Sequence, residues 1–304
     1  MGINVLKQDA EYVCAILEKV LNIVNIKHIE RMGGLTNRTY KVEYGECQAV
    51  VVRIPGEGTA DMICRDDERK STELACQIGI DTELFYFGED GTKIMHYIAD
   101  SETMSAERLQ EEENIHRVAD IFRRLHNCGE DTGVPFEVFG MAANYERVID
   151  QYYIEMYKDY QKIKELVMNI KNQVDAQGEV EKVPCHNDSL CENWVYGEGK
   201  LHLIDWEYAG MNDAMWDLAD ISIEASYNEE QDLVLLKRYF GGEPTNYQMQ
   251  RFIANKLYLD YLWTLWGKTR VPFSGDDMEQ YALERYERLK KNIMKNSQYF
   301  GIEI

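Results

Sequence analysis

The chain has 304 residues, which is long enough for two lobes with substantial cores. Its formal net charge of -21 argues against a nucleic-acid partner, because binding a polyanion needs a concentrated basic face and none is visible. No uncharged apolar run approaches the roughly 18 residues of a membrane helix, and the N-terminus carries charges where a signal peptide is apolar, so we expect a cytoplasmic protein without membrane insertion.

The N-terminal part of the chain is typical of a small antiparallel sheet. Hydrophobic alternation and β-branched runs, separated by Gly-rich or Pro-containing turns, predict a short meander. Apolar residues at helical spacing occur before the first expected strand and again after the third. The expected helices are 9–21 and 66–78, and the expected strands are 26–32, 39–44, 49–54, 83–87 and 93–98.

The pattern changes to long helices after residue 98, with helices expected at 105–126, 142–174, 212–227 and 256–266. This change predicts two domains, a strand-rich lobe at 1–98 and a helix-rich lobe at 99–304. The fold class is therefore α+β, with a small antiparallel β-sheet N-lobe and a larger, mainly helical C-lobe. The sequence leaves the oligomeric state open.

The motif HxDxxxxN, formed by His186, Asp188 and Asn193, is the main chemical signal of the chain. A short apolar run then leads to Asp205 and Glu207, which share one face of an extended segment. Carboxylate and amide oxygens are the ligands that magnesium prefers, and a loop Asp can orient a hydroxyl for phosphoryl transfer. We expect His186 to brace this loop by hydrogen bonding.

Two further groups support a phosphotransferase centre. Gly33, Gly34 and Asn37 form a turn between strands that lets backbone amides approach phosphates, although an ordinary hairpin would show the same pattern. Arg53 ends the third strand, where a kinase-like lobe places the cation that holds phosphates, and Glu73 on the next helix is its expected ion-pair partner.

The helix after Asp205 carries acidic residues that suit two different roles. We expect Asp217 to fasten the catalytic loop by accepting its backbone amides. Glu224 and Tyr227 are three residues apart, so they lie on neighbouring turns, and Glu224 would offset a positive charge on a substrate.

Trp263 and Trp266 lie at i and i+3 of a predicted helix, so their indoles project from the same side. Two such faces could wall a pocket for a quaternary ammonium group through cation–π contact. Spacing alone favours the alternative, a core stripe that packs this helix onto its neighbours.

With these residues in view, the chain resembles the choline/ethanolamine kinase family, within the wider aminoglycoside-phosphotransferase-like group, and is similar above all to its bacterial choline kinases. The resemblance rests on HND with Asn193, on IDWEYAG at 204–210 and on LWTLW at 262–266. It implies a bilobal protein-kinase-like fold, with a nucleotide-binding lobe at 1–98 and a catalytic and substrate-binding lobe at 99–304. It also implies site roles, namely catalysis for Asp188; magnesium binding for Asn193, Asp205 and Glu207; ATP binding for Gly33, Gly34, Asn37, Arg53, Glu73 and the hinge residues Tyr97 and Ile98; and a choline cage of Glu224, Tyr227, Trp263 and Trp266.

The activity that the resemblance implies is the ATP- and Mg²⁺-dependent phosphorylation of choline to phosphocholine. An ethanolamine kinase, or another small-molecule kinase of the same fold, is the close alternative. A catalytically silent kinase-like binding protein is a further alternative, against which the intact Asp188, Asn193 and Asp205 argue.

Overall fold

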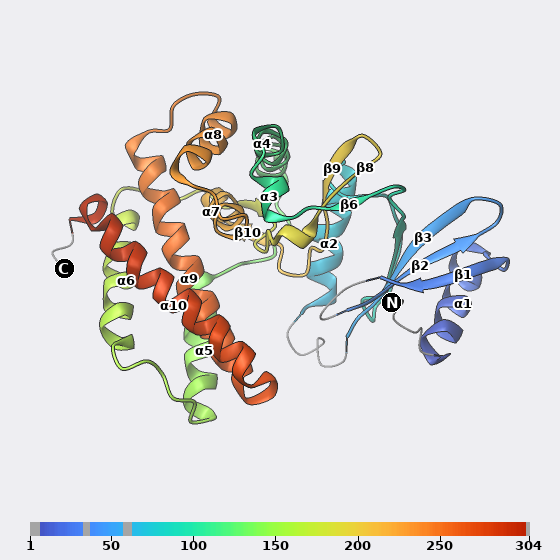
Figure 1. Ribbon diagram of the computed structural model, residues 1–304, viewed down its shortest axis with the longest axis horizontal. Coiled ribbons are helices and arrows are strands. Elements are labelled where there is room, and N and C mark those ends of the chain that lie inside the picture. Colours follow the sequence, from blue (N-terminus) through green and yellow to red (C-terminus); the bar gives the residue numbers. More distant parts are fainter. Residues whose placement is uncertain (1–6, 33–36, 57–62, 302–304) are drawn as a thin grey trace. The chain divides into compact units, whose positions relative to one another are not determined.

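The structure, a computed structural model, describes residues 7–32, 37–56 and 63–301, and the chain divides into two compact units (Figure 1). The first unit comprises residues 1–104 and 192–209, and the second comprises residues 105–191 and 210–304. Sheets dominate the first unit and helices the second. The predicted α+β class, with a small antiparallel sheet and a mainly helical remainder, is confirmed. The placement of the domain boundary at residue 98 stays a prediction.

A five-stranded antiparallel sheet forms most of the first unit, in the order β1-β2-β3-β5-β4. The first three strands are joined in sequence, whereas β5 inserts between β3 and β4 and aligns Lys93 with Arg53. Two cationic side chains from distant parts of the chain thus occupy paired positions. The bounds are β1 Ile26–Arg31, β2 Arg38–Tyr44, β3 Gln48–Ile54, β4 Leu84–Phe87 and β5 Lys93–His96.

Alternation along the strands creates the hydrophobic core of this sheet. Helix α1, Lys7–Leu21, supplies the facing apolar side chains, so one face of the sheet is removed from water. Helix α2, Arg65–Gln77, follows the meander, and a smaller sheet is formed by β6 Glu102–Thr103, β8 Trp194–Gly197 and β9 Lys200–Leu203. The core includes Val13, Leu17, Tyr40, Val42, Val50, Val52 and Ile94.

Helices build the second unit around α9, which packs against α5, α7 and α10 (Figure 1). The only sheet assigned to the described part of this unit pairs β7, Val183–Cys185, with β10, Gly210–Asn212. No helix among the described residues is both long and apolar enough to cross a membrane. The helices are α3 Ala106–Leu109, α4 Glu112–His126, α5 Val138–Gln151, α6 Tyr160–Asp175, α7 Ala214–Glu224, α8 Glu229–Phe240, α9 Asn246–Ser274 and α10 Asp276–Asn296.

The single helix predicted at 142–174 is wrong, because the chain forms α5 and α6 with a break between them. Tyr153 lies in this break with a φ of 53°, a left-handed conformation that an α-helix of L-residues excludes from its interior. Helix α9 begins earlier than predicted, since Thr245 and Gln248 form a capping box at its start. The TxxQ pattern of that capping box was visible in the sequence.

Gly197 offers a direct test of packing in the first unit. A Cβ atom at this position would lie 2.3 Å from Cγ2 of Ile98 and 3.3 Å from the backbone of Ser101. We expect Gly197→Ala to lower the free energy of unfolding by about 1–3 kcal/mol, the usual range for overpacking. Urea denaturation of Gly197→Ala and of Gly242→Ala, whose added methyl group meets nothing within 4 Å, provides the comparison. Equal stability of the two variants would contradict the expectation.

Candidate active site

One buried carboxylate from α7 holds the loop that carries the HxDxxxxN motif. The backbone amides of His186 and Asn187 donate to the two oxygens of Asp217, each at 2.8 Å, and Nε2 of His126 lies 3.0 Å from the same carboxylate. Asp217 and His186 are fully buried, so water does not compete for these charge-assisted hydrogen bonds. The predicted anchoring role of Asp217 is confirmed.

Asn187 has a left-handed backbone, with a φ of 67°, which is uncommon for a residue other than glycine. The side-chain amide of Asn212 donates to its Oδ1 at 2.9 Å, and the indole N–H of Trp216 donates to its carbonyl at 3.2 Å. Surrounding hydrogen bonds of this kind are what maintain a costly backbone conformation at a functional site. The turn therefore sets the direction in which the next residue, Asp188, leaves the backbone.

Asp188 is half-buried, and its amide donates to Nδ1 of His186 at 3.3 Å, so His186 braces the loop as predicted. The amide of the next residue, Ser189, donates to Asp220 of α7. Burial, together with the charges of Glu224 and Asp188, raises the pKa of Asp220 well above its usual value. The loop thus presents Asp188 close to other acidic side chains, an unfavourable arrangement for stability that is common at functional sites.

Three aromatic side chains of α9 and α10 meet in the same unit. We call this group, Trp263, Trp266 and Tyr281, the aromatic corner. The ring centroids of Trp263 and Trp266 are 5.9 Å apart with their planes at 89°, and those of Trp266 and Tyr281 are 5.8 Å apart at 76°. Burial first, and then neighbouring charges that include Glu224 and Asp188, raise the pKa of Tyr281 to about 12. Tyr281 was missed by sequence reasoning, because no motif marks it.

Glu224 and Tyr227 leave the end of α7 in different environments. Nη2 of Arg285 donates to Oε1 of Glu224 at 2.5 Å. Tyr227 is only 8% exposed, and its hydroxyl donates to the carbonyl of Leu109 at 2.9 Å. Their assignment to a substrate site stays a prediction.

Arg53 lies at the centre of an ion-pair cluster in the first unit. The side chain is almost entirely buried, and its guanidinium pairs with Glu68 and Glu207, while Nη2 lies 3.4 Å from Oδ1 of Asp205. Burial disfavours the charged form, but the charges of Asp205 and Glu68 outweigh it and raise the pKa of Arg53. Three of the predicted site residues, Arg53, Asp205 and Glu207, are thus brought together.

The predicted partner of Arg53, Glu73, is wrong, because Glu68 of α2 makes this ion pair. Residues five apart on a helix are rotated by about 140° from each other, so Glu68 and Glu73 project from different sides of α2. Glu68 is 1% exposed, whereas Glu73 is exposed. Sequence reasoning identified the helix correctly but not its inward face.

Lys93 is a second cation in the cluster that sequence reasoning missed. Its Nζ lies 2.9 Å from Oε1 of Glu68, and it is 2% exposed. Burial opposes ionisation of Glu68, but the charges of Lys93 and Arg53 prevail and lower the pKa of its carboxyl to about 2. Lys93 reaches Glu68 because β5 pairs with β3, an arrangement that local sequence does not reveal.

Carboxylate oxygens of Glu68, Asp205 and Glu207 lie within 4.8 Å of one another. Oδ1 of Asp205 is buried and accepts no hydrogen bond from the described residues. Glu207 accepts a hydrogen bond from Nδ2 of Asn37 at 2.6 Å in addition to its ion pair with Arg53. Hard oxygen donors of this kind fit a divalent cation, and Asp205 is the member least engaged with other partners.

The remaining predicted ATP- and magnesium-binding residues that the structure describes lie at separate positions of the first unit. Asn193 is buried in the 3₁₀ turn Cys191–Asn193, and its carbonyl accepts the amide of Ile204 at 2.9 Å. Nζ of Lys41 lies 4.6 Å from the ring centre of Tyr97, and Ile98 is buried. Gly33 and Gly34 lie outside the described residues.

Comparison with known proteins identifies the family. Residues 28–300 match the family described as Choline/ethanolamine kinase. The chain belongs to this family. It is therefore a kinase that binds a nucleotide and acts on a small molecule.

Two curated relatives align with most of this chain. This kinase is 27% identical over 263 residues to Protein LicA of Haemophilus influenzae, an alignment that covers 84% of this chain and 77% of the relative. It is 24% identical over 296 residues to Ethanolamine kinase 2 of Rattus norvegicus, with 89% and 74% covered.

Solved structures share the fold over nearly the whole kinase. A choline/ethanolamine kinase family protein from Mesorhizobium loti has a TM-score of 0.85 and 30% identity, covering 96% of this chain and 98% of that chain. Choline kinase LicA from Streptococcus pneumoniae has a TM-score of 0.80 and 26% identity, with 95% and 100% covered. The predicted kinase-like fold is confirmed.

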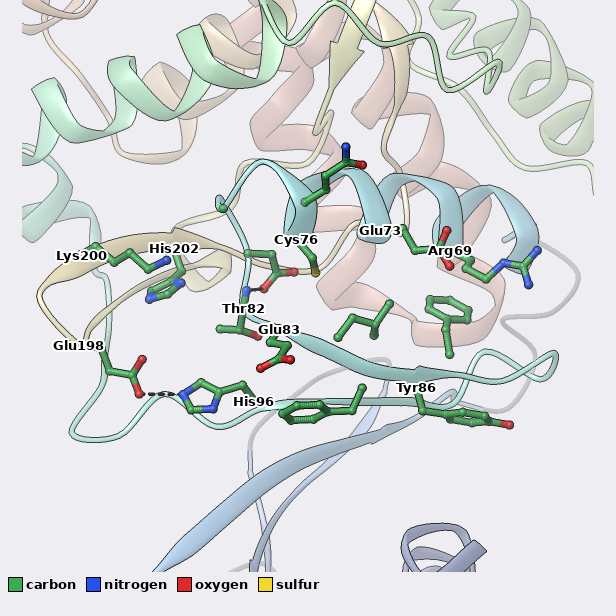
Figure 2. A pocket seen from close by; sticks show the side chains of 16 residues that line it. Arg69, Glu73, Cys76, Thr82, Glu83, Tyr86, His96, Glu198, Lys200 and His202 are labelled. Carbon is green, nitrogen blue, oxygen red and sulfur yellow. Dashed lines mark hydrogen bonds and ion pairs between the residues drawn. The ribbon is translucent and has the colours of Figure 1, made fainter. Parts of the chain in front are cut away.

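A cavity of about 790 Å³ in the first unit of the kinase is lined by α2, β4 and the β8–β9 hairpin. Figure 2 shows Glu73 beside Arg69 on this side of α2, with His202 and Glu198 contributed by the hairpin. Arg53, Glu68, Asp205 and Glu207 do not line it. Glu73 therefore lines this cavity and takes no part in the ion-pair cluster around Arg53.

Replacing Glu68 should affect the kinase far more than replacing Glu73. Glu68→Gln leaves Arg53 and Lys93 buried without their shared counter-charge, which typically lowers the free energy of unfolding by about 3–5 kcal/mol. Glu73→Gln removes the same charge from an exposed position of the same helix and should change it by less than about 0.5 kcal/mol. Urea denaturation measures both variants, and a larger loss for Glu73→Gln would refute the corrected pairing.

Proposed function

We propose that the protein is a choline kinase, which transfers the γ-phosphoryl group of ATP to the hydroxyl of choline and yields phosphocholine and ADP. The observation that carries the proposal is the hydrogen-bonded loop that fixes Asp188, which belongs to the same compact unit as the aromatic corner. A positioned carboxylate together with aromatic faces suits a small alcohol that carries a cationic group.

Asp188 would accept the hydrogen bond of the choline hydroxyl and take its proton as the new oxygen–phosphorus bond forms. The transition state of phosphoryl transfer is loose, so orienting this oxygen matters more than strong basicity. The hydrogen bonds that fix His186, Asn187 and Ser189 support such a positioning role.

Choline presents a quaternary ammonium group with no N–H to donate, so its recognition depends on cation–π and apolar contacts. Trp263, Trp266 and Tyr281 offer such contacts, since their rings meet nearly at right angles and Trp266 is only partly buried. Glu224 and Tyr227 would complete this site from the end of α7.

The nucleotide half of the reaction would use the first unit. Arg53 and Asn37 would contact the phosphates, with Gly33 and Gly34 in the preceding turn and Tyr97 and Ile98 at the adenine. Asn193 and Asp205 would hold Mg²⁺, with Glu207 as a further acidic group, and the bound ion would neutralise phosphate charge.

We place the protein in the cytoplasm.

Ethanolamine kinase is the second candidate, and the similarity to the rat Ethanolamine kinase 2 favours it. Ethanolamine carries a primary ammonium group that donates hydrogen bonds, so a free carboxylate would recognise it better than aromatic faces do. Rates of ADP release with choline, ethanolamine, thiamine and an aminoglycoside test both candidates. Turnover of none of these alcohols would remove the proposed function.

Asp188→Asn should lower kcat by about 10²- to 10⁴-fold, the usual contribution of a positioned general base. Thermal stability should be unchanged or slightly higher, because the substitution removes the negative charge that Asp188 places near Asp220. ADP release and thermal unfolding measure the two effects, with the surface variant Asp175→Asn as control. Near-normal turnover of Asp188→Asn would disprove the mechanism.

Trp266→Ala should weaken choline binding specifically. Loss of one desolvated cation–π contact, about 2 kcal/mol, corresponds to a roughly 30-fold higher KM for choline with little change in the KM for ATP. Phe273→Ala is the matched control, because Phe273 is an aromatic residue of α9 that is 72% exposed. An unchanged choline KM in Trp266→Ala would place the ammonium site elsewhere.

A further inference from the structure

Glu224 does not present a free carboxylate to the aromatic corner. Nη2 of Arg285 donates to its Oε1 at 2.5 Å, and the guanidinium of Arg285 also lies over the ring of Tyr281, 5.1 Å from its centre. Arg285 is 6% exposed, and Glu224 is 16% exposed in its side chain. The acidic residue assigned to the ammonium group therefore already has a fixed cationic partner.

A second ion pair keeps Arg285 available for Glu224. Asp260 of α9 is fully buried and accepts two-pronged hydrogen bonds from Arg288, at 2.9 Å from Nε and 2.5 Å from Nη2. Arg285 lies farther from this carboxylate, with Nη1 at 3.6 Å. Since Arg288 alone can neutralise Asp260, the described contacts leave Glu224 as the closest acidic partner of Arg285.

The ion pair between Arg285 and Glu224 affects primary and quaternary ammonium groups to different degrees. A primary ammonium group that hydrogen-bonds to Glu224 must come close to the guanidinium of Arg285. At such a short distance the two positive charges repel each other. A quaternary ammonium cannot donate hydrogen bonds and so need not approach Glu224, and it can rest against the indole rings rather than against the face of Tyr281 that Arg285 covers. Occupation of Glu224 by Arg285 therefore penalises the primary amine more than the quaternary one.

We infer that Arg285 is a specificity-determining residue, which ties up Glu224 and so favours a quaternary ammonium alcohol over a primary amino alcohol. The inference rests on the proposed function, because it assigns the ammonium group to the corner formed by Trp263, Trp266 and Tyr281. It goes further in assigning the choice between choline and ethanolamine to an ion pair rather than to the indoles alone.

The test compares kcat/KM for choline with kcat/KM for ethanolamine in wild type and in Arg285→Gln. Freeing Glu224 should raise kcat/KM for ethanolamine and lower the choline-to-ethanolamine ratio about 10-fold or more, the factor expected for one charge-assisted hydrogen bond. Lys290→Gln is the control, because it removes one positive charge from the same helix while its partners are Asp159 and Glu287. Its ratio should stay within about twofold of wild type.

Thermal unfolding shows whether Arg285→Gln folds. If it does not, Glu224→Gln provides a second measurement. If Arg285 occupies Glu224 in the wild type, this variant should lower kcat/KM for both substrates by similar factors. A loss several-fold greater for ethanolamine would mean that Glu224 binds the ammonium group directly, and it would overturn the inference.

The outcomes separate the inference from the function on which it rests. Wild-type turnover of choline with an unchanged ratio in a folded Arg285→Gln overturns the inference alone. A wild-type protein that phosphorylates neither alcohol overturns the proposed function, and the inference with it.

Discussion

The buried carboxylate of Asp217 is the constraint on which the loop that carries Asp188 depends. It accepts the amides of His186 and Asn187, and its helix also supplies Asp220 to the amide of Ser189. Removing such a carboxylate would leave buried N–H groups without an acceptor, which is costly in an environment without water. Helix α7 therefore fixes the backbone on both sides of Asp188.

The same helix carries Glu224 at its C-terminal end, the residue to which we assign a part in substrate choice. Asp213 caps its N-terminus by accepting the amide of Met215, and Arg251 of α9 pairs with Asp213. The start of α7 is thereby tied to the helix that carries the two tryptophans. The loop that carries Asp188, the side chain of Glu224 and the aromatic corner are consequently held by contacts within one unit.

Much of this site was accessible from sequence because its signals are local. The HxDxxxxN spacing and the acidic pair at Asp205 and Glu207 each depend on residues that are close along the chain. The anchoring role of Asp217 was predicted as well, although it joins α7 to loop residues 30 and 31 positions away. The meander of the first unit was predictable for the same reason, since β1, β2 and β3 are joined by short turns. Family membership then followed from motifs that occur in a fixed order.

Other features required the tertiary structure. Glu68 replaces Glu73 as the partner of Arg53 because only packing decides which face of α2 is buried, and Lys93 joins them because β5 inserts between β3 and β4. Tyr281 and Arg285 come from α10, whose sequence carries no recognisable motif. The sequence by itself determined the reaction class, since catalytic spacing is local, whereas the partners of each charge depend on elements that meet only after folding.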